Sequence, residues 1–550
     1  MLLRKCIIIF LFLFQVSFCL AQKYTHQDTL RGSITPERIW WDLLHYDLKI
    51  NVNPENKSIT GSNAITYKVL GESNILQIDL QDPLRITKVL KNDQPLKYTR
   101  NGFAYFIELP NKSKIGNIQK LEVFYEGVPA ESINPPWTGG FTWEKDLNGK
   151  DFIATSCQGI GASIWWPNKD HMYDEPDRGM RLSITCPETV MAIANGRLVD
   201  TVDNKNRTRT YVWEVINPIN NYGVNVNIGD YTYFSEKYQG IKGELDCDYY
   251  VLSYHVQKAK EQFKQVPKML EAFEYWFGPY PFYEDSFKLV EVPYLGMEHQ
   301  SSVTYGNGYK NGYLGKDLSG SGWGLKFDFI IIHESGHEWF ANNITYRDIA
   351  DMWIHEGFTA YSETLYVDYH FGKEAGNDYV IGTRKNIRND KPIIGDYDVN
   401  NEGSRDMYPK AANMLHLIRQ VMNDDQKFRK ILMSLNKDFY HQTVTTEQIE
   451  NYISEKSKID FSTVFDQYLR TKNVPILEYK LDGNQMSYRW ANVVDGFSIP
   501  LKVYVNEIEK WIKPSTDWQI LTDEADIEIL EIDRNFYVIR SELDQSNSGS

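Results

Sequence analysis

The stretch HESGHEWF, which begins at His333, contains two histidines four residues apart and a glutamate directly after the first. On a helix, residues i and i+4 lie one turn apart on one face, so His333 and His337 can both offer a ring nitrogen to one metal ion. Glu334 lies on the same rim, where its carboxylate can take a proton from water. A solvated helix face is the alternative, because this pattern also arises by chance.

A catalytic zinc site needs a third protein ligand and a fourth coordination position that is open for water. Glu356, in DMWIHEGFTAYSE, follows His337 with eighteen residues between them. A carboxylate inside an apolar helical run is costly unless it is paired or binds a metal, and a salt-bridged or capping acid is the alternative. Glu363 lies two helical turns further on, where it can accept the second N–H of a zinc histidine; otherwise it is a surface glutamate. The spacing predicts one Zn²⁺ per chain, on His333, His337 and Glu356.

Several segments around these residues resemble the gluzincin aminopeptidases, the family of aminopeptidase N and leukotriene hydrolase. HESGHEWFANNIT and WIHEGFTAYSE resemble the family's HExxH motif and the glutamate that follows after eighteen residues. FGPYPFYEDSFKLVEVPYLGMEHQ resembles the segment that ends in Gly-x-Met-Glu-Asn, and MYPKAANMLHLIR resembles the Tyr-x-Lys-Gly segment. CQGIGASIWWPNKD resembles a segment of the N-terminal domain that lines the site. The likeness covers residues 35–475, with the motifs in order.

The resemblance implies a zinc-dependent metalloaminopeptidase that removes N-terminal residues from peptides with a free N-terminus. Glu334 would act as general base and then general acid, and Tyr408 would donate to the developing oxyanion. Glu298 would hold the α-ammonium group of the substrate, assisted by Gln158. The strand edge that would bind the peptide backbone contains Gly296 and Met297.

The chain departs from the family pattern near this site. The family's asparagine after Glu298 is His299 here, and its asparagine before the third ligand is His355. Leu295 and Ala411 replace glycines of the family. Neither a metal ligand nor the base is lost, but no side-chain preference is carried over from the family.

Three other functions stay open. A zinc endopeptidase would use the same metal site without needing Glu298. A non-catalytic peptide-binding protein on the same scaffold would not need the ligands, the base and Tyr408 together, so their joint presence favours the enzyme. Epoxide hydrolysis of a lipid occurs in one branch of the family, and no feature of this sequence favours it.

The pattern of apolar residues changes along the chain. From residue 46 to 234 it is mainly period two, which predicts many short strands. After Tyr250 apolar residues recur at three and four, which predicts helices to residue 469, and alternating runs such as IPLKVYV then return. The predicted fold class is multidomain α+β. With the resemblance, we expect an N-terminal β saddle (35–240), a thermolysin-like mixed α/β catalytic domain (241–472) and a small C-terminal β sandwich (473–545).

Residues 1–21 have the features of a signal peptide, with a short positive segment, an apolar core too short to span a bilayer with ease, and a cleavage site after Ala21. We expect an exported protein, periplasmic or secreted, without a transmembrane segment in the mature chain. An N-terminal membrane anchor and a lipoprotein modified at Cys19 are the alternatives.

Charge and cysteine content limit the remaining possibilities. The net charge of −15 argues against nucleic acid as a partner, because a basic surface would be needed. Beyond the predicted signal peptide the sequence contains three cysteines, which permit at most one disulfide. They are Cys157, Cys186 and Cys247. The oligomeric state is not indicated.

Overall fold

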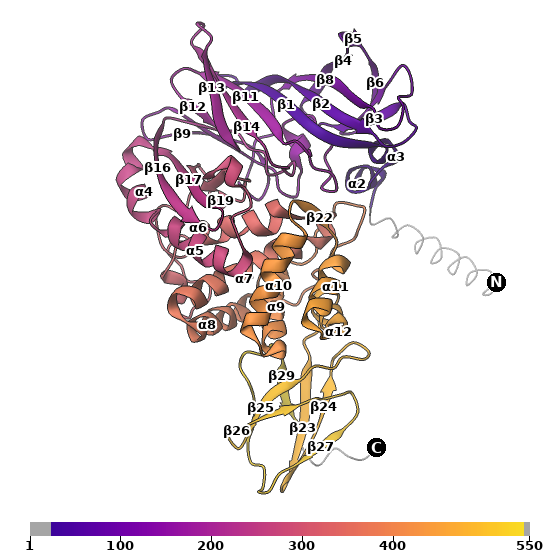
Figure 1. The fold of residues 1–550 in the computed structure, drawn as a ribbon, viewed down its shortest axis with the longest axis vertical. Helices are drawn as coiled ribbons and strands as arrows, with labels where there is room; N and C mark the ends of the chain where they lie inside the picture. The colour runs from indigo at the N-terminus through magenta and orange to yellow at the C-terminus, as the bar shows by residue number, and fades with distance from the viewer. Residues whose placement is uncertain (1–23, 544–550) are drawn as a thin grey trace, which may run out of the picture.

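The computed structural model describes residues 24–543, so the predicted signal peptide lies outside the described residues. Figure 1 shows three parts stacked along the long axis: a β-rich N-terminal part, a helical middle part and a C-terminal part made of strands. This is the predicted α+β class. None of the helices between residues 24 and 543 combines the length and the apolar character that a bilayer span requires.

An eight-stranded sheet forms the body of the N-terminal part. In sheet order its strands are β13 (Arg197–Asp203), β14 (Thr208–Val215), β11 (Met180–Pro187), β1 (Trp41–Asn53), β2 (Ser58–Val69), β8 (Ile118–Gly127), β4 (Arg85–Lys91) and β5 (Gln94–Pro95). β1 runs antiparallel to β2, from the pair Trp41–Val69 to the pair Asn53–Ser58, and a turn at residues 54–57 joins them. Burial alternates along most of β1 and at the C-terminal end of β2, as the period-two pattern predicts, whereas residues 62–65 of β2 are all buried.

Two smaller sheets complete the N-terminal part and share one apolar core with the large sheet. The first contains β3 (Ile75–Asp79), β7 (Ala104–Glu108) and β6 (Lys97–Asn101). The second contains β12 (Met191–Ile193), β15 (Asn227–Gly229), β10 (Asp151–Ser156) and β9 (Gly140–Lys145).

The middle part packs helices against a five-stranded sheet. In sheet order the strands are β16 (Tyr231–Gly240), β17 (Gly243–Leu252), β18 (Phe287–Glu291), β20 (Val303–Tyr305) and β19 (Gly296–Met297). The helices are α4 (Val256–Gln262), α5 (Gln265–Phe277), α6 (Phe329–Gly336), α7 (Trp353–Phe371), α8 (Lys373–Thr383), α9 (Pro409–Met422), α10 (Asp425–Asp438), α11 (Thr446–Ser457) and α12 (Ser462–Leu469). Pro267 lies in the first turn of α5, where a missing backbone N–H costs little.

The C-terminal part consists of two small sheets. One contains β27 (Gln519–Thr522), β24 (Gln485–Ala491), β23 (Ile476–Asp482) and β29 (Ile539–Glu542), and the other contains β26 (Ile508–Ile512), β25 (Leu501–Val505) and β28 (Leu530–Ile532). Leu501, Val503 and Val505 are all buried on one face of β25, as the alternation predicts. Their core is continuous with the core of the middle part.

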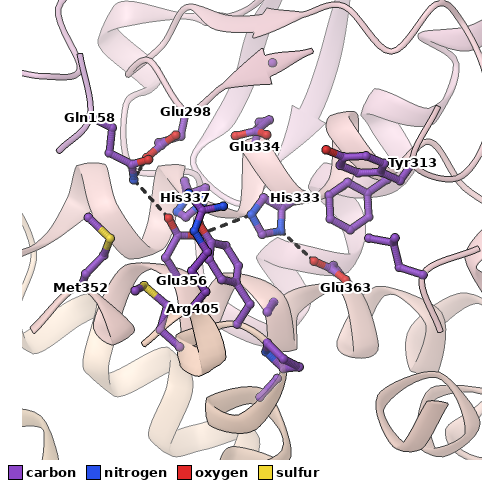
Figure 2. Close-up of a pocket in the computed structure, with 18 of the residues that line it drawn as sticks. Gln158, Glu298, Tyr313, His333, Glu334, His337, Met352, Glu356, Glu363 and Arg405 are labelled. Carbon is purple, nitrogen blue, oxygen red and sulfur yellow. Dashed lines mark hydrogen bonds and ion pairs between the residues drawn. The ribbon is translucent and has the colours of Figure 1, made fainter. Parts of the chain in front are cut away.

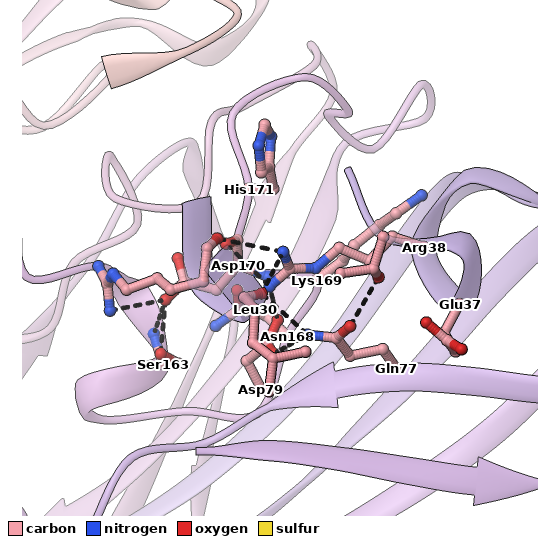
Figure 3. Close-up of polar contacts among 12 residues, drawn as sticks. Leu30, Glu37, Arg38, Gln77, Asp79, Ser163, Asn168, Lys169, Asp170 and His171 are labelled. Atoms are coloured by element: carbon pink, nitrogen blue, oxygen red, sulfur yellow. Dashed lines mark hydrogen bonds and ion pairs between the residues drawn. The ribbon is translucent and has the colours of Figure 1, made fainter. Parts of the chain in front are cut away.

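Buried polar contacts hold a short N-terminal segment against the rest of the N-terminal part (Figure 3). The segment consists of α2 (His26–Gly32) and α3 (Pro36–Ile39). The fully buried Arg38 lies 2.7 Å from the carboxylate of Asp79. Its guanidinium also donates to three carbonyl oxygens of residues 30–33 at 2.8–3.1 Å. Arg38 therefore satisfies both a buried acid and the open carbonyls at the end of α2.

The same segment reaches the middle part. Arg31 Nη2 and Asn400 Nδ2 both donate to the carbonyl oxygen of Gly159, each at 3.1 Å. Gly32 lies so close to the neighbouring loop that a Cβ atom there would stand 2.0 Å from the backbone nitrogen of Asn400. The N-terminal segment thus ties the loop that begins at Gln158 to a loop of the helical part.

Candidate active site

α6 and α7 position the three expected metal ligands. The side chain of Asp328 accepts hydrogen bonds from two backbone N–H groups in the first turn of α6, at 3.1 and 3.4 Å, and so fixes where the helix begins. His333 lies in the last turn of α6, and the helix ends at His337. α7 packs on α6 and carries Glu356 in its first turn.

The three ligands converge with their metal-binding atoms facing one another. Oε2 of Glu356 lies 3.6 Å from Nε2 of His333 and 3.3 Å from Nε2 of His337 (Figure 2). In a tetrahedral site with bonds of about 2.0–2.1 Å, ligand atoms lie about 3.3 Å apart. Oε2 is buried and has no hydrogen-bond partner among the described residues. The donor set and its spacing therefore fit Zn²⁺.

The other ring nitrogen of each histidine is already bound. His333 Nδ1 lies 2.7 Å from Oε1 of Glu363, as predicted for that glutamate's position. His337 Nδ1 lies 3.0 Å from the carbonyl oxygen of Phe340 and 3.0 Å from the hydroxyl of Thr359. A carboxylate or carbonyl partner fixes the tautomer that leaves Nε2 free for a metal.

Glu334 and Tyr408 flank the ligands. Burial raises the pKa of Glu334 to about 7, a value that suits a general base. The ring of Tyr408 stacks on that of His333, with centroids 6.0 Å apart. Burial first, and then the charge of Glu356, hold the pKa of Tyr408 well above its usual range, so its hydroxyl stays a hydrogen-bond donor.

A second carboxylate, that of Glu298, lies beside the ligands. Gln158 Nε2 donates to Glu298 Oε1 at 2.8 Å and to Glu356 Oε1 at 3.1 Å (Figure 2). Asn342 Nδ2 donates to the backbone oxygen of Glu298 at 2.9 Å. The structure thus brings Gln158, from the N-terminal part, to the carboxylates of the middle part.

Gly296 and Met297 form β19, which ends the five-stranded sheet and leaves one strand edge unpaired within residues 24–543. A Cβ atom on Gly296 would lie 2.6 Å from a side-chain carbon of Ile330, so only glycine lets this strand approach α6 so closely. The strand edge, Glu298 and the three ligands all line one cavity of about 760 Å³.

The cavity also contains residues that the sequence did not identify. Tyr313 lies in the Gly- and Tyr-rich segment TYGNGYKNGYLG, Met352 immediately precedes α7, and Arg405 lies three residues before Tyr408. Figure 2 shows all three around the metal ligands. Tyr222, which contacts Glu298, was missed as well, because no local pattern marks a contact across such a separation in the chain.

Comparison with known proteins places the chain in a family. Residues 43–222 match the peptidase M1 N-terminal domain, and residues 261–468 match the peptidase family M1 domain. The chain belongs to peptidase family M1. This confirms the predicted family of zinc aminopeptidases and leukotriene hydrolase, and membership implies zinc.

The individual relatives are distant. Tricorn protease-interacting factor F2 of Thermoplasma volcanium is 22% identical over 413 residues, which cover 72% of this chain and 49% of that protein. Endoplasmic reticulum aminopeptidase 1 of Mus musculus is 22% identical over 424 residues, which cover 73% of this chain and 44% of that protein. Leukotriene A-4 hydrolase of Xenopus laevis is 22% identical over 482 residues, which cover 82% of this chain and 74% of that protein. The chain thus spans about half the length of the first two relatives.

The fold is that of a solved M1 peptidase. A mutant M1 zinc metallopeptidase of Deinococcus radiodurans, crystallised with a Tyr-Ser-Ala substrate, superposes with a TM-score of 0.68 at 20% identity. The match covers 81% of this chain and 98% of that one. The predicted multidomain α+β fold is confirmed. Cys157, Cys186 and Cys247, whose pairing was open, are buried free thiols.

Proposed function

We propose that this protein is an exported zinc metalloaminopeptidase that hydrolyses N-terminal residues from peptides. The observation that carries the proposal is the position of Glu298. Its carboxylate is joined to the ligand Glu356 through the single side chain of Gln158, with hydrogen bonds of 2.8 and 3.1 Å. Because this carboxylate lies so close to the metal site, a peptide whose α-ammonium group binds it must have its first peptide bond at the metal.

Each residue has a defined task in the hydrolysis. Zinc, when bound by His333, His337 and Glu356, supplies a Lewis acid that polarises the scissile carbonyl and activates water. Glu334 takes a proton from the attacking water as the new C–O bond forms, and passes it to the nitrogen of the leaving amine as the peptide C–N bond breaks.

Binding and charge stabilisation come from the rest of the cavity. The hydroxyl of Tyr408 donates to the oxygen that becomes negatively charged in the transition state. The unpaired edge of β19 offers backbone hydrogen bonds to an extended substrate, and Gln158 holds Glu298 in place. Export rests on the predicted signal peptide at residues 1–21, and the destination is a periplasm or the extracellular medium.

The test is hydrolysis of free and N-acetylated aminoacyl and dipeptide substrates by the mature chain, with and without a metal chelator. We expect cleavage of the free substrates alone, abolished by the chelator and restored by Zn²⁺. Equal cleavage of blocked peptides would indicate an endopeptidase, and no cleavage by zinc-loaded protein would indicate a binding protein.

Glu298→Ala tests the proposed ammonium site directly. The loss of a charge-assisted contact of roughly 1.5–3 kcal/mol should lower kcat/KM for free substrates about 10- to 100-fold. Glu126→Ala is a suitable control, because Glu126 carries an exposed ion pair with Arg85 on the N-terminal sheet. Unchanged kcat/KM in Glu298→Ala would refute the assigned role.

A further inference from the structure

Glu298 receives two hydrogen bonds on the same oxygen. Gln158 Nε2 donates to Oε1 at 2.8 Å, and the hydroxyl of Tyr222 donates to Oε1 at 3.1 Å. Both of these side-chain donors act on Oε1, and neither acts on Oε2 of the same carboxylate. An ammonium group that approaches Glu298 can therefore bind Oε2 without displacing either side-chain donor.

The direction of the Tyr222 hydrogen bond follows from the residues behind it. The backbone N–H of Tyr346 donates to His355 Nε2 at 2.8 Å, so that nitrogen is an acceptor. The proton of a neutral ring then lies on Nδ1, which is 3.3 Å from the hydroxyl oxygen of Tyr222. Because that oxygen accepts from His355, the hydroxyl hydrogen is free to point at Glu298.

Packing leaves this chain of hydrogen bonds little freedom. Tyr222, Tyr346, His355 and Glu298 are each at most 3% exposed. The ring of His355 stacks on that of Tyr346, with centroids 4.1 Å apart, and on that of Tyr222 at 6.4 Å. Tyr222 comes from the N-terminal part and the other three residues from the middle part, so the contact also depends on how the two parts meet.

We propose that Tyr222, oriented by His355, is a positioning residue that turns Oε2 of Glu298 toward the substrate's α-ammonium group and so sets the preference for an unblocked amino terminus. This inference rests on the role of Glu298 under the proposed function. His355 stands where the family resemblance leads one to expect asparagine, so this arrangement is a property of the chain itself.

The experiment measures binding, so that it does not depend on turnover. Zinc-loaded Glu334→Gln protein is titrated with leucyl-leucine amide and with its N-acetyl derivative by calorimetry. Tyr222→Phe keeps the ring and removes only the hydroxyl. We expect it to weaken binding of the free dipeptide about tenfold and to leave the acetylated dipeptide unchanged, because one hydrogen bond to a charged group is lost.

A matched control is Tyr361→Phe, which removes another buried hydroxyl that lies 3.1 Å from a histidine Nδ1, that of His416. It should leave both affinities unchanged. His355→Gln can still accept from Tyr346 and donate to Tyr222, so it should retain most of the preference, whereas His355→Leu should lose it. In a Glu298→Gln background, Tyr222→Phe should have no further effect on the preference.

The inference is overturned if Tyr222→Phe keeps the full preference for the free dipeptide, if its effect persists unchanged in Glu298→Gln, or if the Glu334→Gln protein has no such preference. A failure of the proposed function is a different result, namely that the unsubstituted, zinc-loaded protein hydrolyses no peptide. Preferential binding of the free dipeptide that depends on Tyr222 would support the inference even then.

Discussion

Glu363 lies 2.7 Å from His333 Nδ1, and we expect its replacement to weaken zinc binding without unfolding the protein. Both side chains are buried, so water screens this contact little. A hydrogen bond to a charged partner contributes roughly 1.5–3 kcal/mol, which corresponds to a factor of about 10–100 in the dissociation constant. Glu363→Ala should therefore raise the zinc dissociation constant by about that factor.

Glu363→Gln separates charge from hydrogen bonding. An amide oxygen still accepts from Nδ1, but a neutral hydrogen bond contributes only about 0.5–1.5 kcal/mol. The dissociation constant should then rise by roughly five- to tenfold, less than for Glu363→Ala. Tyr379→Phe is the control, because the hydroxyl of Tyr379 donates to Glu363 Oε2 at 2.5 Å and reaches the ligand His333 only through Glu363. We expect it to have a smaller effect than either.

The assay is competition for Zn²⁺ between metal-free protein and a chromophoric chelator, with circular dichroism to verify that each variant is folded. A folded Glu363→Ala variant whose dissociation constant changes by less than about threefold would refute the reasoning, because the hydrogen bond would then not orient the ligand. An effect of Glu363→Gln equal to that of Glu363→Ala would show that the charge alone matters.

Three further predictions concern other parts of the chain. Burial raises the pKa of Asp328 to about 6, so the folded state holds this proton more tightly than the unfolded state does. Relative to Asp328→Asn, the free energy of unfolding should therefore fall by about 2 kcal/mol as the pH rises from 4 to 6. Urea-unfolding profiles of the two proteins that stay parallel over this pH range would contradict this. Arg31→Ala removes one of the two donors to the carbonyl oxygen of Gly159 and so loosens the loop that begins at Gln158, which holds Glu298. KM should therefore rise about three- to tenfold with kcat little changed, whereas Arg85→Ala should change neither. A thiol reagent should label none of the three buried cysteines in native mature protein and all three in guanidinium; labelling before unfolding would show that they are accessible.

The metal site could be predicted from the sequence because its parts lie on two helices at regular spacing. Helical geometry alone places His333 beside His337, and Glu363 two turns beyond Glu356. The end of α6 could not be predicted in the same way. Phe340 leaves helical geometry at φ −129° and ψ 83°, and this turn returns its carbonyl oxygen to His337 Nδ1.

The contacts around Glu298 were less predictable. The family resemblance indicated Glu298 and Gln158, but the Tyr222 hydrogen bond joins residues 76 positions apart. No periodicity encodes such a contact, because it depends on how the N-terminal sheet meets the helical part. The substitution at His355 was visible in the sequence, yet its consequence required the positions of Tyr222 and Tyr346.

The contact between α2 and the loop at Asn400 bears on how substrates enter. The backbone of Gly32 leaves no room for a Cβ atom beside Asn400, and the hydroxyl of Tyr24 donates to Asp396 on the same loop. Rotating the N-terminal and middle parts away from each other would have to break these contacts together with the hydrogen bond from Asn400 to Gly159. We therefore expect the cleft to keep one geometry, so that, under the proposed function, a peptide would enter it by its amino end without a closing movement of the two parts.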